Sequence, residues 1–221
     1  VTVNYSIATI YRRLYGTRFR VVRNVPYRLD APARKEKHEG KQMIIYQGSL
    51  NVGRGLELII DAMHYLPEVK LLLAGTGDME KELRKRVRYK QLGDRVEFMG
   101  RVLPEDLTRL TMRADLGISL EEDLGLSYRY SLSNKLFDYI QCRVPVLCSA
   151  LPEMSRIVDS YGVGISTRER DPEKIAAIVR YMLKERSGGA CLEALDKEAP
   201  YLCWENESKV YLYLLEECGV L

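Results

Sequence analysis

The chain has 221 residues, of which 46% are hydrophobic and 29% are charged, and its formal net charge at pH 7 is +3. These fractions are near globular averages, so the composition excludes an intrinsically disordered chain. The charge excess is far below the dense basic surface of nucleic-acid-binding proteins, so we expect no nucleic acid partner. No apolar run approaches the ~20 residues that cross a bilayer.

The chain opens at Val1 rather than at a methionine, and its first residues have the pattern of the tail of a strand. We therefore expect a piece of a longer protein. Residues 5–16 have a helical pattern and residues 19–22 a strand pattern. The prolines and charges between residues 26 and 41 predict a solvent-exposed linker.

From residue 41 onward, short β-rich runs alternate with helical patterns, and Gly, Asp or Pro bounds each run. The predicted strands are Met43 to Gln47, Val69 to Ala74, Arg95 to Met99, Asp115 to Ser119, Val144 to Cys148 and Val163 to Ser166. Predicted helices lie near residues 54–66, 78–91, 104–113, 134–142, 151–159, 172–186 and 205–218. This alternation predicts an α/β, Rossmann-like fold with a doubly wound, six-stranded parallel sheet, which binds ligands beyond the carboxyl ends of its strands.

The cysteines and histidines indicate neither a disulfide framework nor a metal site. The five cysteines are odd in number, show no CxxC spacing and lie mostly in apolar segments. This favours a reducing compartment, and we expect the cytoplasm. The two histidines, His38 and His64, have no partner at metal-ligand spacing, so we expect no metal and no other cofactor.

A glycine-rich turn, Gly48-Ser-Leu-Asn-Val-Gly-Arg-Gly55, follows the first of these strands and opens a helix. Backbone N–H groups at such a turn suit a phosphate, and Arg54 adds a fixed positive charge. The alternative is an ordinary loop with a surface arginine. A second turn, Gly75-Thr-Gly77, lacks the third glycine of a dinucleotide-binding motif, and by itself it is a weak signal.

The segment Ser131-Leu-Ser-Asn-Lys-Leu-Phe-Asp-Tyr139 has the most informative polar pattern. Ser133 or Asn134 is a good N-cap, which places Lys135 in the first helical turn and Asp138 one turn further along. The helix dipole disfavours a cation at that end unless an anion docks there, and Asp138 could then accept hydrogen bonds from vicinal hydroxyls of a sugar. The alternative is a helix that simply packs its apolar residues into the core, namely Leu136, Phe137 and Ile140.

Four segments, in order and spacing, resemble the donor-binding, C-terminal half of a retaining, family-4-type (group 1) glycosyltransferase of GT-B fold. They are Tyr46-Gln-Gly-Ser-Leu50 with Arg54-Gly55, Leu72-Leu-Ala-Gly-Thr-Gly-Asp78, Val96-Glu-Phe-Met-Gly-Arg-Val102 with Asp106-Leu107, and Asn134-Lys-Leu-Phe-Asp-Tyr-Ile140 through Pro145-Val146.

The resemblance implies that the substrate is a nucleoside-diphosphate sugar and that no metal is required. Arg54 would stabilise charge on the departing diphosphate as a catalytic residue, and Lys135 is a second candidate for that role. Asp138 takes the place of the second glutamate of the family's E-x7-E pair, which binds the ribose hydroxyls. The other donor-binding candidates are Gly48, Ser49, Gly100, Arg101, Val102, Tyr130, Ser133, Asn134 and Leu136. We expect the diphosphate at the carboxyl ends of the first and fifth strands, where Arg54, Lys135 and Asp138 would touch it together.

The sequence departs from the family pattern at several of these positions. Ser49 replaces the family's first arginine, Arg54 its lysine, and Tyr130 the first glutamate of the pair, which usually contacts the donor sugar. Nearby acids are out of register with that glutamate, namely Glu121, Glu122 and Asp123. The donor sugar, the base and the acceptor stay open, as do the oligomeric state and any membrane association.

The resemblance also implies a domain organisation. Residues 1–40 would end an N-terminal domain and form the interdomain linker, residues 41–200 would bind the nucleotide sugar, and residues 201–221 would form a helix that crosses back toward the missing N-terminal acceptor domain. We therefore expect an enzyme of polysaccharide biosynthesis that is inactive as this fragment. Two alternatives are a non-catalytic nucleotide-sugar-binding module and another Rossmann-like sugar-nucleotide enzyme such as an epimerase.

Overall fold

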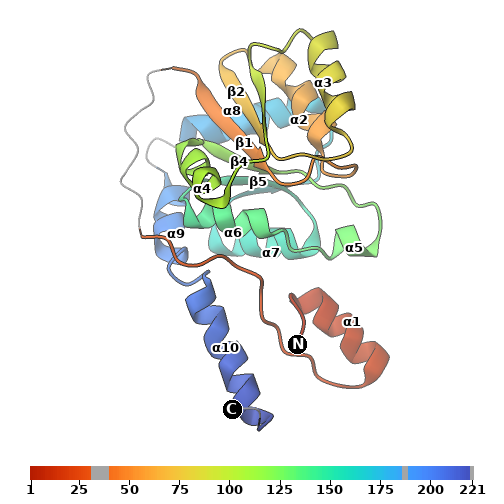
Figure 1. Cartoon of the computed structure of the whole chain (residues 1–221), viewed down its shortest axis with the longest axis vertical. Coiled ribbons are helices and arrows are strands. Elements are labelled where there is room, and N and C mark those ends of the chain that lie inside the picture. Colours follow the sequence, from red (N-terminus) through yellow and green to blue (C-terminus); the bar gives the residue numbers. More distant parts are fainter. Residues whose placement is uncertain (31–39, 186–188, 220–221) are drawn as a thin grey trace.

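The computed structural model describes residues 1–30, 40–185 and 189–219 and is built around one parallel sheet. Its strands are β1 (Gln42–Gln47), β2 (Val69–Ala74), β3 (Val96–Gly100), β4 (Leu116–Ser119), β5 (Val146–Ser149) and β6 (Gly164–Thr167). The strand order is β3-β2-β1-β4-β5-β6 (Figure 1). This confirms the predicted doubly wound sheet of six strands, and each predicted strand lies within two residues of the observed one.

Helices cover both faces of the sheet. One face carries α2 (Leu56–Ala62), a 3-10 turn (Met63–Tyr65), α3 (Glu80–Tyr89) and α8 (Pro172–Glu185). The other carries α4 (Pro104–Arg113), α6 (Asn134–Gln141) and α7 (Pro152–Tyr161), and α9 (Ala190–Glu198) packs on α6 and α7. The short helix α5 (Leu126–Arg129) and α9 have no counterpart among the predicted helices.

The apolar strand sequences have a direct physical reason. Ile44 and Tyr46 of β1 face the core cluster of α2, α3 and α8, whereas Ile45 faces the cluster that contains α6 and α7. Because successive side chains of a strand point to opposite faces, a strand covered on both faces must be apolar throughout.

The flanking segments form a second region beside this domain. Helix α1 (Tyr5–Tyr15) starts at Asn4, whose side chain accepts a hydrogen bond from the Ile7 amide, and ends at Gly16. Helix α10 (Trp204–Glu217) follows α9, and both α1 and α10 lie below the sheet in Figure 1. The expected interdomain linker falls largely outside the described residues, at 31–39, and residues 186 and 220–221 of the predicted terminal elements lie outside them as well.

The predicted strand at residues 19–22 is wrong. The segment makes one isolated parallel bridge, between Thr2 and Val21, and no ladder. The Thr2 amide donates to Arg20 O, and Thr2 O accepts from the Val22 amide. Among the described residues, Thr2 is the one bridge partner of this segment. A strand needs a run of hydrogen bonds to a neighbouring strand, which no described element supplies here.

Candidate functional site

The candidate site lies where two central, neighbouring strands end. β1 leads into the glycine-rich turn and β4 leads into residues 120–133, and the two loops contact each other. The Glu122 amide donates to Gly53 O at 2.9 Å, and the Tyr128 hydroxyl donates to Val52 O at 3.0 Å. The site therefore belongs to the carboxyl ends of the first and fourth strands, which corrects the expectation of the first and fifth. Lys135 and Asp138 lie on α6, which comes after β4 and before β5 in the chain, so they lie beyond the carboxyl end of β4 rather than of β5.

Glycines hold these loops in contact. A Cβ atom on Gly55, which has φ +69°, would lie 2.0 Å from Leu120 O, and one on Gly75, which has φ +147°, would lie 1.9 Å from Gly48 O. The Gly75-Thr-Gly77 turn therefore packs tightly against the first loop, which is a structural role. A Cβ on Gly48 would lie 3.5 Å from the Tyr46 hydroxyl and 3.6 Å from Cε of Lys135, so this glycine packs at van der Waals distance beside the Lys135 side chain.

Arg54 is a half-buried cation without a carboxylate partner among the described residues. It lies in the turn before α2 rather than within the helix, and its guanidinium stacks over the Tyr128 ring at 5.7 Å. Its Nε is buried and has no hydrogen-bond partner in the described part of the chain. An unsatisfied buried donor destabilises a fold unless a ligand completes it, so Arg54 is suited to an anion.

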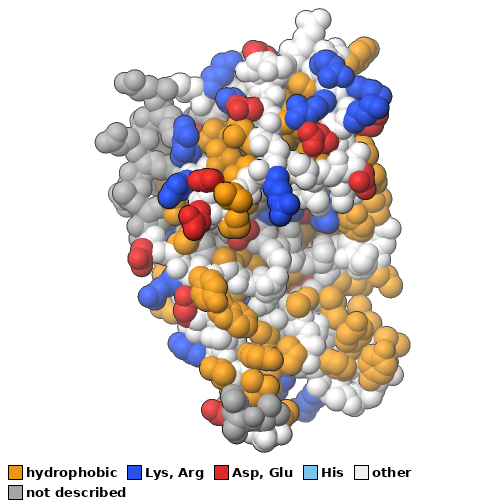
Figure 2. Space-filling model, viewed as in Figure 1, with side chains coloured by type: hydrophobic (Ala, Val, Ile, Leu, Met, Phe, Trp, Pro, Cys, Tyr) orange, Lys and Arg blue, Asp and Glu red, His pale blue; other side chains and the backbone are white. Residues whose placement is uncertain are grey.

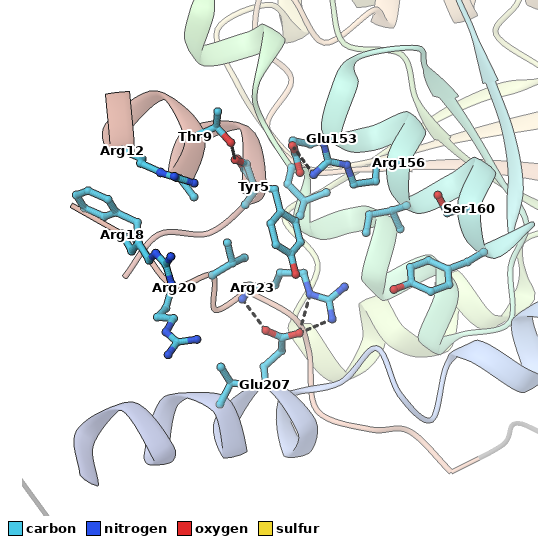
Figure 3. Close-up of a pocket in the computed structure, with 18 residues that line it drawn as sticks. Tyr5, Thr9, Arg12, Arg18, Arg20, Arg23, Glu153, Arg156, Ser160 and Glu207 are labelled. Atoms are coloured by element: carbon cyan, nitrogen blue, oxygen red, sulfur yellow. Dashed lines mark hydrogen bonds and ion pairs between the residues drawn. The ribbon is translucent and has the colours of Figure 1, made fainter. Parts of the chain in front are cut away.

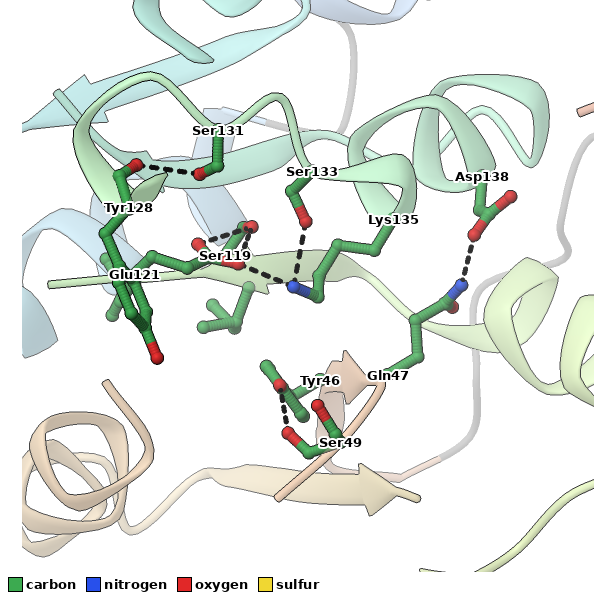
Figure 4. Close-up of polar contacts among 12 residues, drawn as sticks. Tyr46, Gln47, Ser49, Ser119, Glu121, Tyr128, Ser131, Ser133, Lys135 and Asp138 are labelled. Carbon is green, nitrogen blue, oxygen red and sulfur yellow. Dashed lines mark hydrogen bonds and ion pairs between the residues drawn. The ribbon is translucent and has the colours of Figure 1, made fainter. Parts of the chain in front are cut away.

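Lys135 lies at the N-terminus of α6, as predicted, but it has a protein partner that the sequence did not indicate (Figure 4). Its Nζ lies 2.6 Å from Oε1 of Glu121 and 3.0 Å from Oγ of Ser133, and 5.1 Å above the centre of the Tyr46 ring. The lysine side chain is 8% exposed and the glutamate 0%. Glu121 therefore explains much of the tolerance for a cation at this helix end. Ser133 is the N-cap, but its side chain makes no capping bond.

Glu121 stays ionised although it is buried. Burial acts to raise the pKa of this carboxyl, but the charge and hydrogen bond of Lys135, together with the Ser119 hydroxyl, outweigh it and hold the pKa below its ordinary value. Arg170 holds the backbone of the same loop, because its guanidinium donates to Leu120 O, Glu121 O and Ser149 Oγ at 2.6–2.9 Å. Glu121 is thus held by its side chain and by its backbone, and its pairing with Lys135 joins the loop that follows β4 to the start of α6.

Asp138 lies one turn along α6 and faces β1. Its Oδ2 accepts a hydrogen bond from Gln47 Nε2 at 2.8 Å. Burial raises the pKa of Asp138 to about 6, against smaller opposing effects of the Gln47 hydrogen bond and the Lys135 charge. A carboxyl held this way changes its protonation state close to neutral pH.

Beside Asp138 is a cavity of about 370 Å³ between α4, α6 and the segment at residues 26–29. Its lining is mostly apolar or uncharged and includes Pro26, Leu107, Thr111 and Gln141. Small-molecule sites combine such walls with a few polar groups, and Asp138 and Gln47 provide them here.

The structure groups some of the predicted site residues and separates others. Gly48, Ser133 and Lys135 lie together, and Ser49 and Asn134 are exposed next to them. Gly100 ends β3, which β2 and β1 separate from β4, and its carbonyl accepts from the Gly75 amide. Arg101 is exposed and Val102 is half-buried.

Leu136 and Tyr130 are placed less favourably for ligand contact. The Leu136 side chain is fully buried in the core and its amide donates to Ser133 O, so neither group is available to a ligand. Tyr130 is half-buried, and its carbonyl accepts from Asn4 Nδ2 at 2.8 Å. A larger cavity, of about 870 Å³, lies between α1, residues 18–23, α7 and α10 and contains none of the predicted site residues (Figure 3).

The described residues include no cluster of three or more His, Cys, Asp or Glu side chains that could hold a metal ion. In the same residues, no helix is both long and apolar enough to cross a membrane. None of the five cysteines forms a disulfide.

The sheet order and the loops at its carboxyl edge define a Rossmann-like α/β domain with the fold of the C-terminal domain of GT-B enzymes. A family model described as glycosyl transferases group 1 matches residues 28–199. The match covers most of the chain, which therefore belongs to the group 1 glycosyl transferases.

Individual relatives agree with this assignment. An uncharacterized glycosyltransferase of Methanocaldococcus jannaschii is 27% identical over 192 residues, which are 82% of this chain and 47% of that protein. Sucrose-phosphate synthase from Thermosynechococcus elongatus has a TM-score of 0.75 at 21% identity, over 99% of this chain and 58% of that one. Anabaena HepE, solved in complex with UDP and glucose, has a TM-score of 0.69 at 17% identity, over 82% and 49% of the two chains. The chain thus spans about half the length of these relatives.

Proposed function

We propose that this domain binds the nucleoside-diphosphate sugar of a retaining glycosyltransferase. The observation that carries the proposal is Arg54, whose buried Nε has no partner in the described part of the chain, at the edge where Lys135 and Asp138 also lie. Solved structures of similar fold include one in complex with UDP and one in complex with UDP-glucose, which supports the same ligand class here.

The two cations would act on the diphosphate. Arg54 offers its free guanidinium N–H groups, which can hydrogen-bond phosphate oxygens in a bidentate manner. Lys135 has three N–H donors, of which Glu121 and Ser133 engage two, so one remains for a phosphate oxygen. When the bond from the sugar to the diphosphate breaks, negative charge grows on the departing nucleoside diphosphate, and these groups would stabilise it.

The nucleoside would extend toward Asp138. The ionised carboxylate would accept hydrogen bonds from the ribose hydroxyls, and the adjoining apolar cavity and the end of β3 at Gly100, Arg101 and Val102 would lie along the base. The mainly apolar lining suits a flat heterocyclic ring.

The acceptor site would lie largely on a second domain. We propose that α1 belongs to the end of such a domain and that α10 crosses back toward it, because both helices expose large apolar side chains. On α1 these are Tyr5, Tyr11, Leu14 and Tyr15, and on α10 Val210, Tyr211, Leu212 and Tyr213. Figure 2 shows orange side chains gathered over the lower half of the molecule, where Figure 1 places both helices. Exposed apolar patches of this kind mark protein interfaces.

Three further proposals concern activity, compartment and process. The chain alone would transfer no sugar, because half of the reaction centre would be missing. Its free cysteines support assembly in a reducing compartment such as the cytoplasm. Polysaccharide biosynthesis is the process in which we place the whole protein.

Calorimetric titration of UDP into the chain and into Arg54→Ala tests the donor site. A charge-assisted hydrogen bond contributes roughly 1.5–3 kcal/mol, so affinity should fall roughly ten- to hundredfold. Arg88→Ala is the matched control, since Arg88 is an exposed arginine on α3. Equal affinity of Arg54→Ala and the wild type would contradict the proposed site.

A second candidate function is a non-catalytic nucleotide-sugar-binding module. This alternative is favoured by Tyr130, which stands where the family has the glutamate that contacts the donor sugar. The Asn4 side chain donates a hydrogen bond to the Tyr130 carbonyl and so holds the backbone at this position. Turnover of UDP-glucose by a longer form of the protein that includes an N-terminal domain would exclude this alternative. UDP binding by that longer form, without turnover of any nucleotide sugar supplied to it, would support it.

A further inference from the structure

Gln47 lies between Asp138 and α4 at the end of β1, and it is 4% exposed. Its Nε2 donates to Asp138 Oδ2 at 2.8 Å, and its Oε1 accepts from the Thr111 hydroxyl at 2.7 Å. Thr111 is 1% exposed and belongs to α4. A continuous chain of hydrogen bonds thus joins two helices through the side chain of one strand residue.

The direction of this chain depends on one proton. The Thr111 oxygen lies 2.7 Å from Gln47 Oε1 and 2.8 Å from Leu107 O, but the hydroxyl has a single hydrogen to donate. If it donates to Gln47, the amide presents N–H to Asp138, which suits an ionised carboxylate. If it donates to Leu107, the amide can turn over and present its oxygen, which suits only a protonated Asp138.

We infer that Gln47, oriented by Thr111, is a positioning residue that holds Asp138 as an ionised hydrogen-bond acceptor for the hydroxyls of a bound nucleotide. The inference rests on the proposed function of the site. Figure 4 shows one carboxylate oxygen turned toward Gln47 and the other turned away from it. Gln47 therefore engages one oxygen and leaves the second for a ligand.

Few other groups near Asp138 could stabilise its carboxylate in place of Gln47. Among the described residues, Lys135 is the charged side chain whose field favours the Asp138 carboxylate, and Glu121 already pairs with Lys135. The groups that line the cavity beside Asp138 on α4 and at residues 26–29 are uncharged. The pKa of Asp138, about 6 with Gln47 in place, leaves little margin for losing a donor.

The test combines an NMR titration of Asp138 with UDP binding by the whole chain. Gln47→Met keeps the length of the side chain and removes both hydrogen bonds. We expect a higher Asp138 pKa in this variant and a roughly two- to tenfold weaker affinity for UDP at pH 7. The affinity gap between UDP and 2′,3′-dideoxy-UDP, which lacks the ribose hydroxyls, should shrink as well. Thr111→Val should weaken UDP binding in the same direction, whereas Thr111→Ser, which keeps the hydroxyl, should restore wild-type behaviour.

Two results would overturn the inference. One is an unchanged Asp138 pKa in folded Gln47→Met. The other is a pKa that moves while UDP affinity stays at the wild-type value, although Asp138→Ala weakens it. Failure of the wild-type chain to bind UDP or any other nucleoside diphosphate would contradict the proposed function instead, and the Asp138 titration would still decide whether Gln47 controls the carboxylate.

Discussion

The ammonium group of Lys135 lies 2.6 Å from a carboxylate oxygen of Glu121, and the protein removes both groups almost completely from water. Breaking a buried pair leaves one uncompensated charge, which usually costs about 3–5 kcal/mol. We therefore expect Glu121→Ala to lower the free energy of unfolding by an amount of that order. Urea denaturation measures it, with the neighbouring, more exposed Glu122→Ala as the control. A loss below about 1 kcal/mol would show that the pair contributes little.

Arg54→Met should separate binding from stability. The substitution removes a buried donor that has no partner in the described structure and keeps an apolar chain against Tyr128. We expect the free energy of unfolding to be unchanged or about 1 kcal/mol higher, and UDP affinity to fall. Arg95→Met is the contrasting control, because Arg95 donates to the carbonyls of Met63 and Leu66, and it should destabilise the fold. Destabilisation by Arg54→Met would point to a structural role.

Asp138→Asn should be more stable than the wild type at pH 7. The folded-state pKa of Asp138 is about 6, above the ordinary value of 3.8, so the folded state binds the proton more tightly than the unfolded state. The wild type therefore loses stability as the pH rises from about 4 to about 6, and the loss is complete above that range. The substitution removes this cost, which is about 2–3 kcal/mol at most. Melting temperatures from pH 4 to 8 should converge at the acid end, and parallel curves would refute the expectation.

UDP binding should weaken in acid for the same reason. An ionised Asp138 accepts hydrogen bonds from the ribose hydroxyls under the proposed function, and below its pKa of about 6 this acceptor becomes protonated. We expect affinity to decline between pH 7 and pH 5 in the wild type and to vary less in Asp138→Asn. Titration calorimetry at three pH values measures this. Equal slopes for the two proteins would place the titrating group elsewhere, for example on the phosphate.

Gly75→Ala and Gly100→Ala should differ in severity although both glycines have positive φ. A methyl group on Gly75 would overlap Gly48 O, whereas one on Gly100 meets no atom within 4 Å. Gly100→Ala carries only the cost of its backbone conformation, roughly 1 kcal/mol, and Gly75→Ala must also move a loop. Chemical denaturation of the two variants tests this, and similar stabilities would show that the loops yield easily.

Most of the sheet could be predicted from the sequence because its strands are apolar on both faces and its helices keep their own periodicity. The strand predicted at residues 19–22 could not be excluded from the sequence, because strand formation depends on a neighbouring strand, and among the described residues this segment bridges to Thr2 alone. The short helix α5 has too few residues to show a period.

The site was only partly predictable. The helix position of Lys135 follows from the local pattern around Ser133. Its partner Glu121 lies 14 residues earlier, outside the reach of helix spacing, and comes close through the contact of β4 with α6. In the sequence, Gln47 has no feature that separates it from the other residues of its predicted strand, and its contacts with Asp138 and Thr111 form only in the folded chain. Such tertiary polar contacts have no local sequence signal.

The close contacts of Gly55 with Leu120 and of Gly75 with Gly48 have a consequence for engineering. The loop after β1 packs closely against the loop after β2 on one side and the loop after β4 on the other, so its shape depends on both. A chimaera that exchanges the loop after β1 with a relative would meet mismatched backbones at both of these contacts. Donor preference is therefore best transplanted by moving all three loops as a single cassette.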